Sequence, residues 1–338
     1  MNRILALLVM CICILTGCGE KEETPEVSVP VARAAYIING NAQTISVFDI
    51  EKSEVRNDVL PVGKYPADIK IRGDRAYVVN SGDNSIQIID LASLKQVGMI
   101  NTGDGTSPER IGFVTDRKAY VSCLTTNSAK VIDMISQQAA KNIPVGVWPQ
   151  GVAVSKQKVY VCNTAYDLAS KSYGKGTVSV IDSSTDTVIK TINVETNPTE
   201  AAISNGMVVI LCTGNYGDIV GKLVIIDPAT DSVAKTIDLG ATPSGVAISP
   251  KGIAYVTSFG GLLSADTGSG SMIHTAAAPL SDFAGGAGLA IDKDGNGYIC
   301  VPDWTPAGKD KLLVMDASEK LVGTHKLSGG ASIIALRE

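Results

Sequence analysis

Three charged residues occupy equivalent places in short phrases that recur along the chain. Each stands two positions after a proline, in KYPADIKI, TSPERIGF and TNPTEAAI, and the three are Asp68, Arg110 and Glu200. In two sister phrases, VWPQGVAV and ATPSGVAI, the same position is glycine. Two carboxylates and a guanidinium that converge in space can bind a polar ligand or an ion. The alternative is a solvated lining that binds nothing.

Other residue types that carry chemistry give little support for catalysis. The chain has two histidines, His274 and His325, and neither accompanies the nucleophile and orienting acid that a catalytic triad needs. The stretch DKDGNG at 292–297 alternates oxygen ligands as a calcium loop does, but its twelfth position is Asp303 instead of glutamate. Asp-Gly and Asn-Gly are also hairpin-turn signals. We expect a turn here, and we expect no catalytic residue, no metal site and no cofactor.

Four cysteines lie downstream of Cys18, each in a similar apolar segment of a different repeat: Cys123, Cys162, Cys212 and Cys300. No pair has the C-x-x-C spacing of a metal or haem site. Small buried thiols behave as hydrophobic residues. We therefore predict free, buried thiols instead of disulfides.

These phrases belong to a longer repeat. The hairpin pattern AYIINGNAQTISVFD at 35–49 returns as AYVVNSGDNSIQIID at 76–90, and then along the rest of the chain. The second positions of successive copies are 40 to 49 residues apart: Tyr36, Tyr77, Tyr120, Tyr160, Val209, Tyr255 and Tyr298. Each unit contains four short strands, and one such sheet cannot bury both of its faces alone. The sequence predicts an all-β fold, a seven-bladed β-propeller of four-stranded blades.

The repeats resemble the YVTN repeat family of β-propellers, whose pattern is P-x-G-V-A-V, then Y-V-T-N, then T-V-S-V-I-D. The best matches are GTVSVIDSSTDTVIKTINV at 176–194 and PSGVAISPKGIAYVTSF at 243–259, and the resemblance extends from about residue 34 to 337. It implies the propeller fold. It implies little about activity, because members are mostly cell-envelope proteins of uncertain role. The chain departs from the pattern at Asp68, Arg110 and Glu200.

The two ends of the repeat region are complementary. Residues 35–49 and 54–60 supply second, third and outermost strands with no innermost strand before them. Residues 331–336 supply an innermost strand with nothing after it. We expect the C-terminal strand to complete the first blade and close a propeller that spans residues 34–338.

The first residues indicate export. Residues 1–17 have a basic start and an apolar run, as a secretory signal does. The stretch Leu15-Thr16-Gly17-Cys18 at its end resembles the lipobox of bacterial lipoproteins. In that family the cysteine is lipidated and becomes the mature N-terminus. An uncleaved anchor and a plain signal peptide are the alternatives. We expect residues 18–33 to be a flexible tether, and the protein to lie in the bacterial cell envelope, lipid-anchored and either periplasmic or surface-exposed.

Long loops between second and third strands are concentrated in the later repeats. In a propeller these loops share a face with the links that enter the innermost strands. Together these loops and links carry six aromatic residues: Tyr65, Trp148, Tyr166, Tyr173, Tyr216 and Trp304. We predict a ligand-binding face here, at the channel mouth that also bears the charged trio. The alternative is that loops simply tolerate insertions.

Two classes of function remain. The net charge of −5 argues against non-specific nucleic-acid binding. We expect a monomer that is attached to the membrane through its N-terminal lipid. The first class is a binding or scaffold module for a protein, a glycan or a small ligand. The second is an enzyme or redox-partner subunit, similar to a lactonase or to the large subunit of an amine dehydrogenase, with its site at the channel mouth. The lack of a catalytic constellation favours the first.

Overall fold

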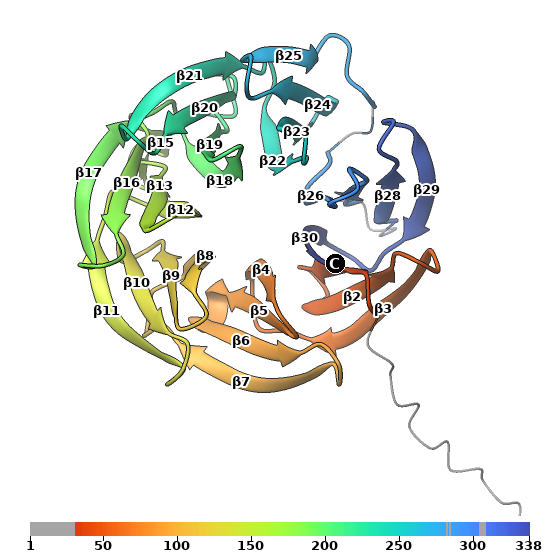
Figure 1. The fold of residues 1–338 in the computed structure, drawn as a ribbon, viewed down its shortest axis with the longest axis horizontal. Coiled ribbons are helices and arrows are strands. Elements are labelled where there is room, and N and C mark those ends of the chain that lie inside the picture. The colour runs from red at the N-terminus through yellow and green to blue at the C-terminus, as the bar shows by residue number, and fades with distance from the viewer. Residues whose placement is uncertain (1–30, 282, 284, 304–308) are drawn as a thin grey trace, which may run out of the picture.

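Seven four-stranded antiparallel sheets form a closed ring around a central channel (Figure 1). The computed structural model describes residues 31–281, 283, 285–303 and 309–338. In every blade the strands run from innermost at the channel to outermost at the rim. This confirms the predicted fold class.

The blades follow one another in chain order. Blade 1 contains β30 (Ala331–Arg337), β1 (Ala34–Asn39), β2 (Thr44–Asp49) and β3 (Glu54–Pro61). Blade 2 contains β4 (Pro66–Arg72), β5 (Arg75–Asn80), β6 (Ser85–Asp90) and β7 (Lys95–Asn101), and blade 3 contains β8 (Pro108–Thr115), β9 (Lys118–Cys123), β10 (Ser128–Asp133) and β11 (Gln138–Pro144). Blade 4 contains β12 (Pro149–Ser155), β13 (Lys158–Asn163), β16 (Thr177–Asp182) and β17 (Thr187–Asn193).

Blade 5 contains β18 (Pro198–Ser204), β19 (Met207–Cys212), β20 (Lys222–Asp227) and β21 (Ser232–Asp238). Blade 6 contains β22 (Pro243–Ile248), β23 (Ile253–Ser258), β24 (Gly261–Asp266) and β25 (Ser271–His274). Blade 7 contains β26 (Leu289–Ile291), β27 (Gly297–Val301), β28 (Lys311–Met315) and β29 (Leu321–Lys326). The loop between β13 and β16 forms a small hairpin of its own, β14 (Tyr166–Asp167) and β15 (Ser172–Tyr173).

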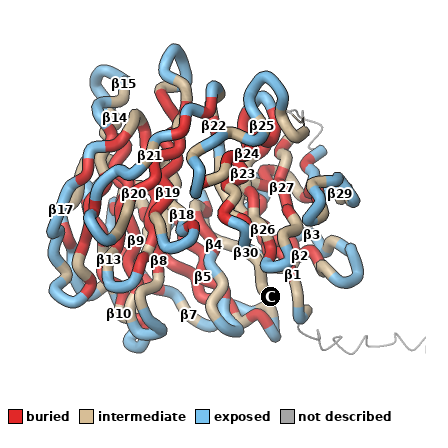
Figure 2. Tube along the Cα trace, turned by 45° about the horizontal axis from the view of Figure 1, so that its top comes forward, coloured by how far each residue is buried: buried red, intermediate tan, exposed pale blue. Residues whose placement is uncertain are grey.

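The core lies between the blades. Alternate residues of a strand point to opposite faces of its sheet, so a second strand contributes to two interfaces. In β13, Val159 and Val161 pack toward blade 3, whereas Tyr160 and Cys162 pack toward blade 5. The outermost strands are mainly exposed, and Figure 2 shows buried residues concentrated in the inner strands.

Polar contacts between blades surround this core. The hydroxyl of Tyr160 in blade 4 donates to Asp231 Oδ1 of blade 5 at 2.7 Å, and Lys158 Nζ lies 2.6 Å from Asp231 Oδ2. Tyr255 of blade 6 donates to Glu319 of blade 7 at 2.7 Å in the same way. Burial, and after it the carboxylate, raises the pKa of both hydroxyls, so they remain donors. Each bond joins a second strand to the outer turn of the next blade.

The ring closes as predicted, by pairing of β30 with β1. Beside that pair, Arg33 Nη2 lies 2.6 Å from Asp294 Oδ2 and 3.2 Å from Asp292 Oδ2, in the β26–β27 hairpin. The backbone N–H of Lys293 in the same hairpin donates to Glu338 Oε1 at 2.7 Å. The first described residues and the C-terminus are therefore fastened to blade 7 on one face.

Two further expectations concern cysteine and calcium. Cys123, Cys162, Cys212 and Cys300 are free and buried, as predicted, and burial raises the pKa of the Cys212 thiol to about 12. Residues 292–297 form the expected turn, in which Asn296 N donates to Asp292 Oδ1 at 2.7 Å.

The part of the chain that the structure covers contains no group of three or more His, Cys, Asp or Glu side chains placed to hold a metal ion. None of its segments forms a helix with the length and apolar character that crossing a bilayer requires.

Deletion of residues 331–338 should open the ring. It removes β30, exposes the edge of β1 and takes the buried Ala331 and Ile334 out of the interface between blades 1 and 7. We expect a loss of at least about 4 kcal/mol in the free energy of unfolding, together with aggregation through the exposed edge. Gel filtration and thermal melting measure both effects. Deletion of Glu338 alone is the control, because it leaves β30 whole and removes only the exposed hydrogen bond from Lys293 N; a protein that lacks residues 331–338 yet stays monomeric with an unchanged melting temperature would contradict the prediction.

Candidate functional site

One face of the ring carries the loops between second and third strands and the links that enter the innermost strands. Backbone hydrogen bonds tie these two sets together: Ser81 N donates to Tyr65 O at 3.0 Å, and Thr164 N to Trp148 O at 3.2 Å. We call this side the insertion face. The first described residues and the C-terminus lie on the opposite face, and in Figure 2 the β14–β15 hairpin and the C-terminus lie on opposite sides of the ring.

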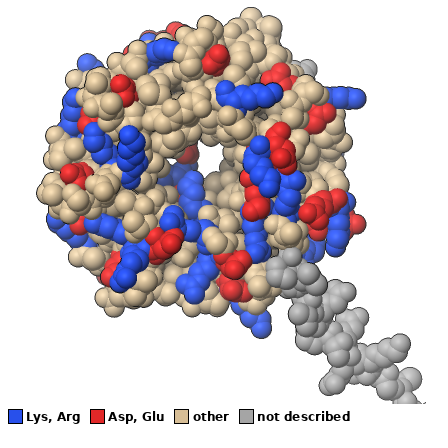
Figure 3. Space-filling view, viewed as in Figure 1, with Lys and Arg blue, Asp and Glu red and all other residues tan. Residues whose placement is uncertain are grey.

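A cavity of about 620 Å³ occupies the channel at its insertion-face mouth, and Figure 3 shows the channel as a hole through the centre of the ring. Its two walls differ in charge. The wall from blades 2, 3 and 5 carries Asp68, Lys70, Glu109, Arg110 and Glu200. The wall from blades 6, 7 and 1 carries uncharged residues: Ser244, Gly245, Val246, Ala287, Gly288, Leu289, Ser332, Ile333, Ile334, Gly40 and Asn41.

A β-bulge aims the charged trio at the channel. The register of the innermost strand shifts by one residue between Pro66 and Asp68 in blade 2, and between Pro198 and Glu200 in blade 5. The shift in blade 3 falls between Pro108 and Ile111. An extra residue bends the strand and redirects the side chains beside it. The sequence correctly placed Asp68, Arg110 and Glu200 together, and the bulge is the local structure that does so.

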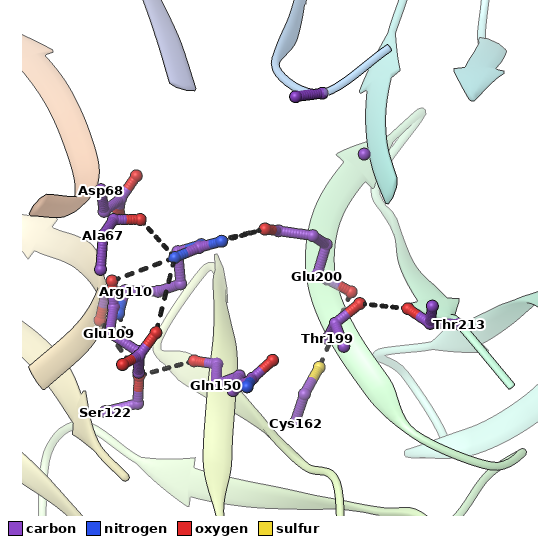
Figure 4. Close-up of polar contacts among 12 residues, drawn as sticks. Ala67, Asp68, Glu109, Arg110, Ser122, Gln150, Cys162, Thr199, Glu200 and Thr213 are labelled. Carbon is purple, nitrogen blue, oxygen red and sulfur yellow. Dashed lines mark hydrogen bonds and ion pairs between the residues drawn. The ribbon is translucent and has the colours of Figure 1, made fainter. Parts of the chain in front are cut away.

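Arg110 joins three blades in one network (Figure 4). Its Nε donates to both carboxylate oxygens of Glu200, at 3.0 and 3.2 Å, and Nη2 also donates to Oε1. Its Nη1 donates to the backbone carbonyl of Ala67 in blade 2. Asp68 Oδ2 accepts from Ile111 N at 3.0 Å, and Lys70 Nζ lies 3.3 Å from Asp68 Oδ1. Paired in this way, the charges are held in fixed positions.

The ion pair from blade 3 to blade 5 passes blade 4, where the equivalent residue is Gly151. A Cβ atom on Gly151 would lie 2.9 Å from the Cα and carbonyl carbon of Glu200. The backbones of β12 and β18 therefore approach more closely than a side chain allows. Glycine here lets Glu200 reach Arg110.

Sequence reasoning missed two charged members of this wall. Lys70 follows Asp68 by two positions in the same strand, so strand alternation could have placed it beside Asp68. Glu109 precedes Arg110 directly, and simple alternation would have put the two on opposite faces. The bulge in β8 brings both to the cavity, and the sequence alone does not show the bulge.

Glu109 is the carboxylate without a close cation of its own. Ser81 Oγ donates to its Oε1 at 3.0 Å, and Arg110 Nη1 is 4.0 Å from Oε2. Its side chain is 18% exposed. Burial raises the pKa of the Glu109 carboxyl. Arg110 opposes the rise, whereas the carboxylates of Glu200 and Asp68 add to it.

The expected aromatic residues divide into two places. Tyr65 lines the cavity and is 76% exposed. Trp148, Tyr166, Tyr173 and Tyr216 instead form a chain over blades 4 and 5, with ring centroids 5.1, 4.9 and 6.2 Å apart in that order. These four are not among the residues that line the cavity, and they support the β14–β15 hairpin, in which Tyr166 pairs with Tyr173. Trp304 lies outside the described residues.

Two of these aromatic residues have a left-handed backbone conformation. Tyr65 and Trp148 have φ of +48° and +54°, and each precedes a proline. The left-handed region is costly for residues with a Cβ, and a following proline restricts the backbone further. Ser107 and Asn197 precede prolines at the equivalent place in blades 3 and 5 and share this conformation, with φ of +45° and +59°, so it belongs to the repeat and does not by itself mark a site.

Comparison with known proteins supports the fold. No protein-family profile matches the chain, and no curated protein sequence matches it. Among solved structures, hydrazine synthase of Kuenenia stuttgartiensis is 19% identical with a TM-score of 0.66, over 80% of this chain and 89% of that chain. A quinonprotein alcohol dehydrogenase-like protein from Bacteroides thetaiotaomicron is 16% identical with a TM-score of 0.69, over 91% and 79%.

A third solved structure, the dihydro-heme d1 dehydrogenase NirN in complex with DHE, is 14% identical with a TM-score of 0.60, over 92% of this chain and 76% of that chain. At these identities the three structures show a shared propeller fold and nothing about shared chemistry.

Substitution of Gly151 by alanine should separate β12 from β18. The new Cβ would meet the Glu200 backbone, and we expect the free energy of unfolding to fall by about 2 kcal/mol, as for other overpacked sites. Urea unfolding measures the loss. Gly329→Ala is a suitable control, because beyond its chain neighbours no heavy atom lies within 4 Å of the place its Cβ would take, and its φ is outside the left-handed region. Equal stability of the wild type and Gly151→Ala would show that the close approach is unnecessary.

Substitution of Glu109 by glutamine should stabilise the fold at neutral pH. A carboxyl whose pKa is higher in the folded state binds more protons there, so its stability contribution falls as pH rises through that pKa. Glutamine removes this penalty, and we expect a gain of about 0.5–1 kcal/mol at pH 7. The gain should shrink toward zero as pH falls below about 4. Thermal melts across pH measure it, with Glu54→Gln on exposed β3 as the control, and no gain at pH 7 would count against a penalty at Glu109.

Proposed function

We propose that this protein is a lipid-anchored β-propeller of the bacterial cell envelope, of the YVTN repeat type. We propose further that it acts as a binding module whose ligand or partner occupies the channel mouth on the insertion face. The observation that carries this proposal is the cavity of about 620 Å³, with one charged and one uncharged wall. Its volume lies within the range of roughly 300–1,000 Å³ that is typical of ligand sites.

The charged wall supports binding more than catalysis. Arg110 and Glu200 neutralise each other, and Asp68 is engaged by a backbone N–H and by Lys70. Groups that are fixed and paired orient a ligand at little entropic cost. A general acid or base must itself lie within hydrogen-bond reach of the reacting proton, and of the three carboxylates in this wall only Glu109 is not committed to such a pair.

The anchor and the cavity are compatible in space. Cys18, the proposed lipid-bearing residue, is 15 residues before Arg33 in the sequence. Arg33 is fastened to the β26–β27 hairpin, on the face opposite the cavity. A lipid attached at Cys18 leaves the insertion face open to a partner.

The alternative class is an enzyme or redox-partner subunit. The three similar structures are named for hydrazine synthase, a dehydrogenase and a quinonprotein alcohol dehydrogenase-like protein, but their identity to this chain is 14–19%. At that identity the structural likeness supports the shared fold only. A stoichiometric metal ion or redox cofactor in the purified protein would favour this alternative.

The proposal is tested by recovery of the bound species from membranes. The tagged full chain, made with Cys18 intact in the bacterium that encodes it, is crosslinked, extracted in detergent and examined by native mass spectrometry. Tyr65→Ala and Lys70→Met alter exposed cavity residues and should leave the fold intact, because the two side chains are 76% and 48% exposed. We expect each to lower recovery at least tenfold, which corresponds to about 1.4 kcal/mol.

Two controls complete the experiment. Lys95→Met changes an exposed lysine on outermost strand β7 and should leave recovery unchanged. Cys18→Ser should release the protein from the membrane fraction. Full recovery with both cavity variants would place the working surface elsewhere, and a Cys18→Ser protein that stays membrane-bound would contradict the lipid anchor.

A further inference from the structure

We infer that the insertion face docks a protein segment that places one basic side chain in the channel mouth beside Glu109, with apolar residues on either side of it. This inference rests on the proposed function and specifies the partner. It follows from the charge inside the cavity and from the exposed apolar side chains on the same face. Tyr65 is part of both features.

The cavity has one carboxylate in excess. Three carboxylates, Asp68, Glu109 and Glu200, face two cations, Lys70 and Arg110. The guanidinium of Arg110 is committed to Glu200 through both carboxylate oxygens, and Lys70 lies against Asp68. Glu109 retains a hydroxyl donor, Ser81, and a cation no nearer than 4.0 Å. An ammonium or guanidinium group from a partner would supply the missing charge.

Exposed apolar side chains are concentrated on the same face. Among the described residues, six large apolar side chains that are at least 42% exposed lie in its loops and links: Tyr65, Val147, Leu168, Tyr216, Ile219 and Phe259. In the described loops of the opposite face, Ile135 is the comparable side chain. The six belong to blades 2, 4, 5 and 6 and to their links, a spread too wide for a small amine. Apolar and aromatic residues of this kind are typical of protein interfaces.

Tyr65 belongs to both features. It lines the cavity, it is 76% exposed, and it stands at the rim between the charged wall and the surface. The face of an aromatic ring attracts cations, so Tyr65 and Glu109 both favour a basic side chain at this place. The same charge pattern disfavours a membrane as the occupant, because anionic lipids are held by basic surfaces and this mouth is acidic.

A peptide array tests the inference directly. The full chain in detergent is applied to pentapeptides with leucine and tyrosine flanks, in which the central position varies through all natural residues and norleucine. We expect lysine and arginine at the centre to bind about tenfold more tightly than norleucine, the usual gain from one charge-assisted hydrogen bond. Calorimetry with the lysine and norleucine peptides then gives the ratio of dissociation constants in solution.

The variants assign this preference to Glu109. Glu109→Gln should reduce the ratio to below twofold, whereas Asp104→Asn, which alters an exposed carboxylate in the β7–β8 link of the same face, should leave it near tenfold. A preference for neutral or acidic centres, or one that Glu109→Gln retains, would overturn the inference. Absence of binding to every peptide would also overturn it. In each of these cases the membrane-recovery experiment still decides separately whether the channel mouth binds anything.

Discussion

Every blade of this protein must be covered on both faces, and the rest of the structure follows from that requirement. The second strand of blade 4 sends Val159 toward one neighbour and Tyr160 toward the other, and both side chains are fully buried. A single sheet of this kind would expose a large apolar face to water, so no blade is stable alone. A ring satisfies all seven sheets at once, provided that it closes.

Closure explains the arrangement of polar bonds as well as of apolar residues. Bonds such as those from Tyr160 to Asp231 and from Tyr255 to Glu319 join neighbouring blades beside the apolar interfaces. Pairing of β30 with β1 makes the seventh interface equivalent to the others. Most of the stability therefore comes from contacts between neighbouring blades.

The channel mouth shows features that do not benefit the fold. Glu109 is held in surroundings that raise its pKa, which costs stability when the group is ionised. Gly151 gives up a side chain so that Arg110 can reach Glu200. Such departures from local preference are expected at functional sites, and this cavity is where we propose that binding occurs.

The sequence by itself determined the fold, the number of blades and the strand that closes the ring, because the repeat and the alternation of apolar residues are local patterns. It also placed Asp68, Arg110 and Glu200 at the channel, because each holds the same place in its repeat. Only the tertiary structure decided which of them bond, since the pair Arg110–Glu200 skips a blade and depends on the absence of a side chain at Gly151. It also decided that Glu109 faces the cavity and that Trp148, Tyr166 and Tyr216 do not, because bulges and loop packing reorient side chains in ways that no local pattern records.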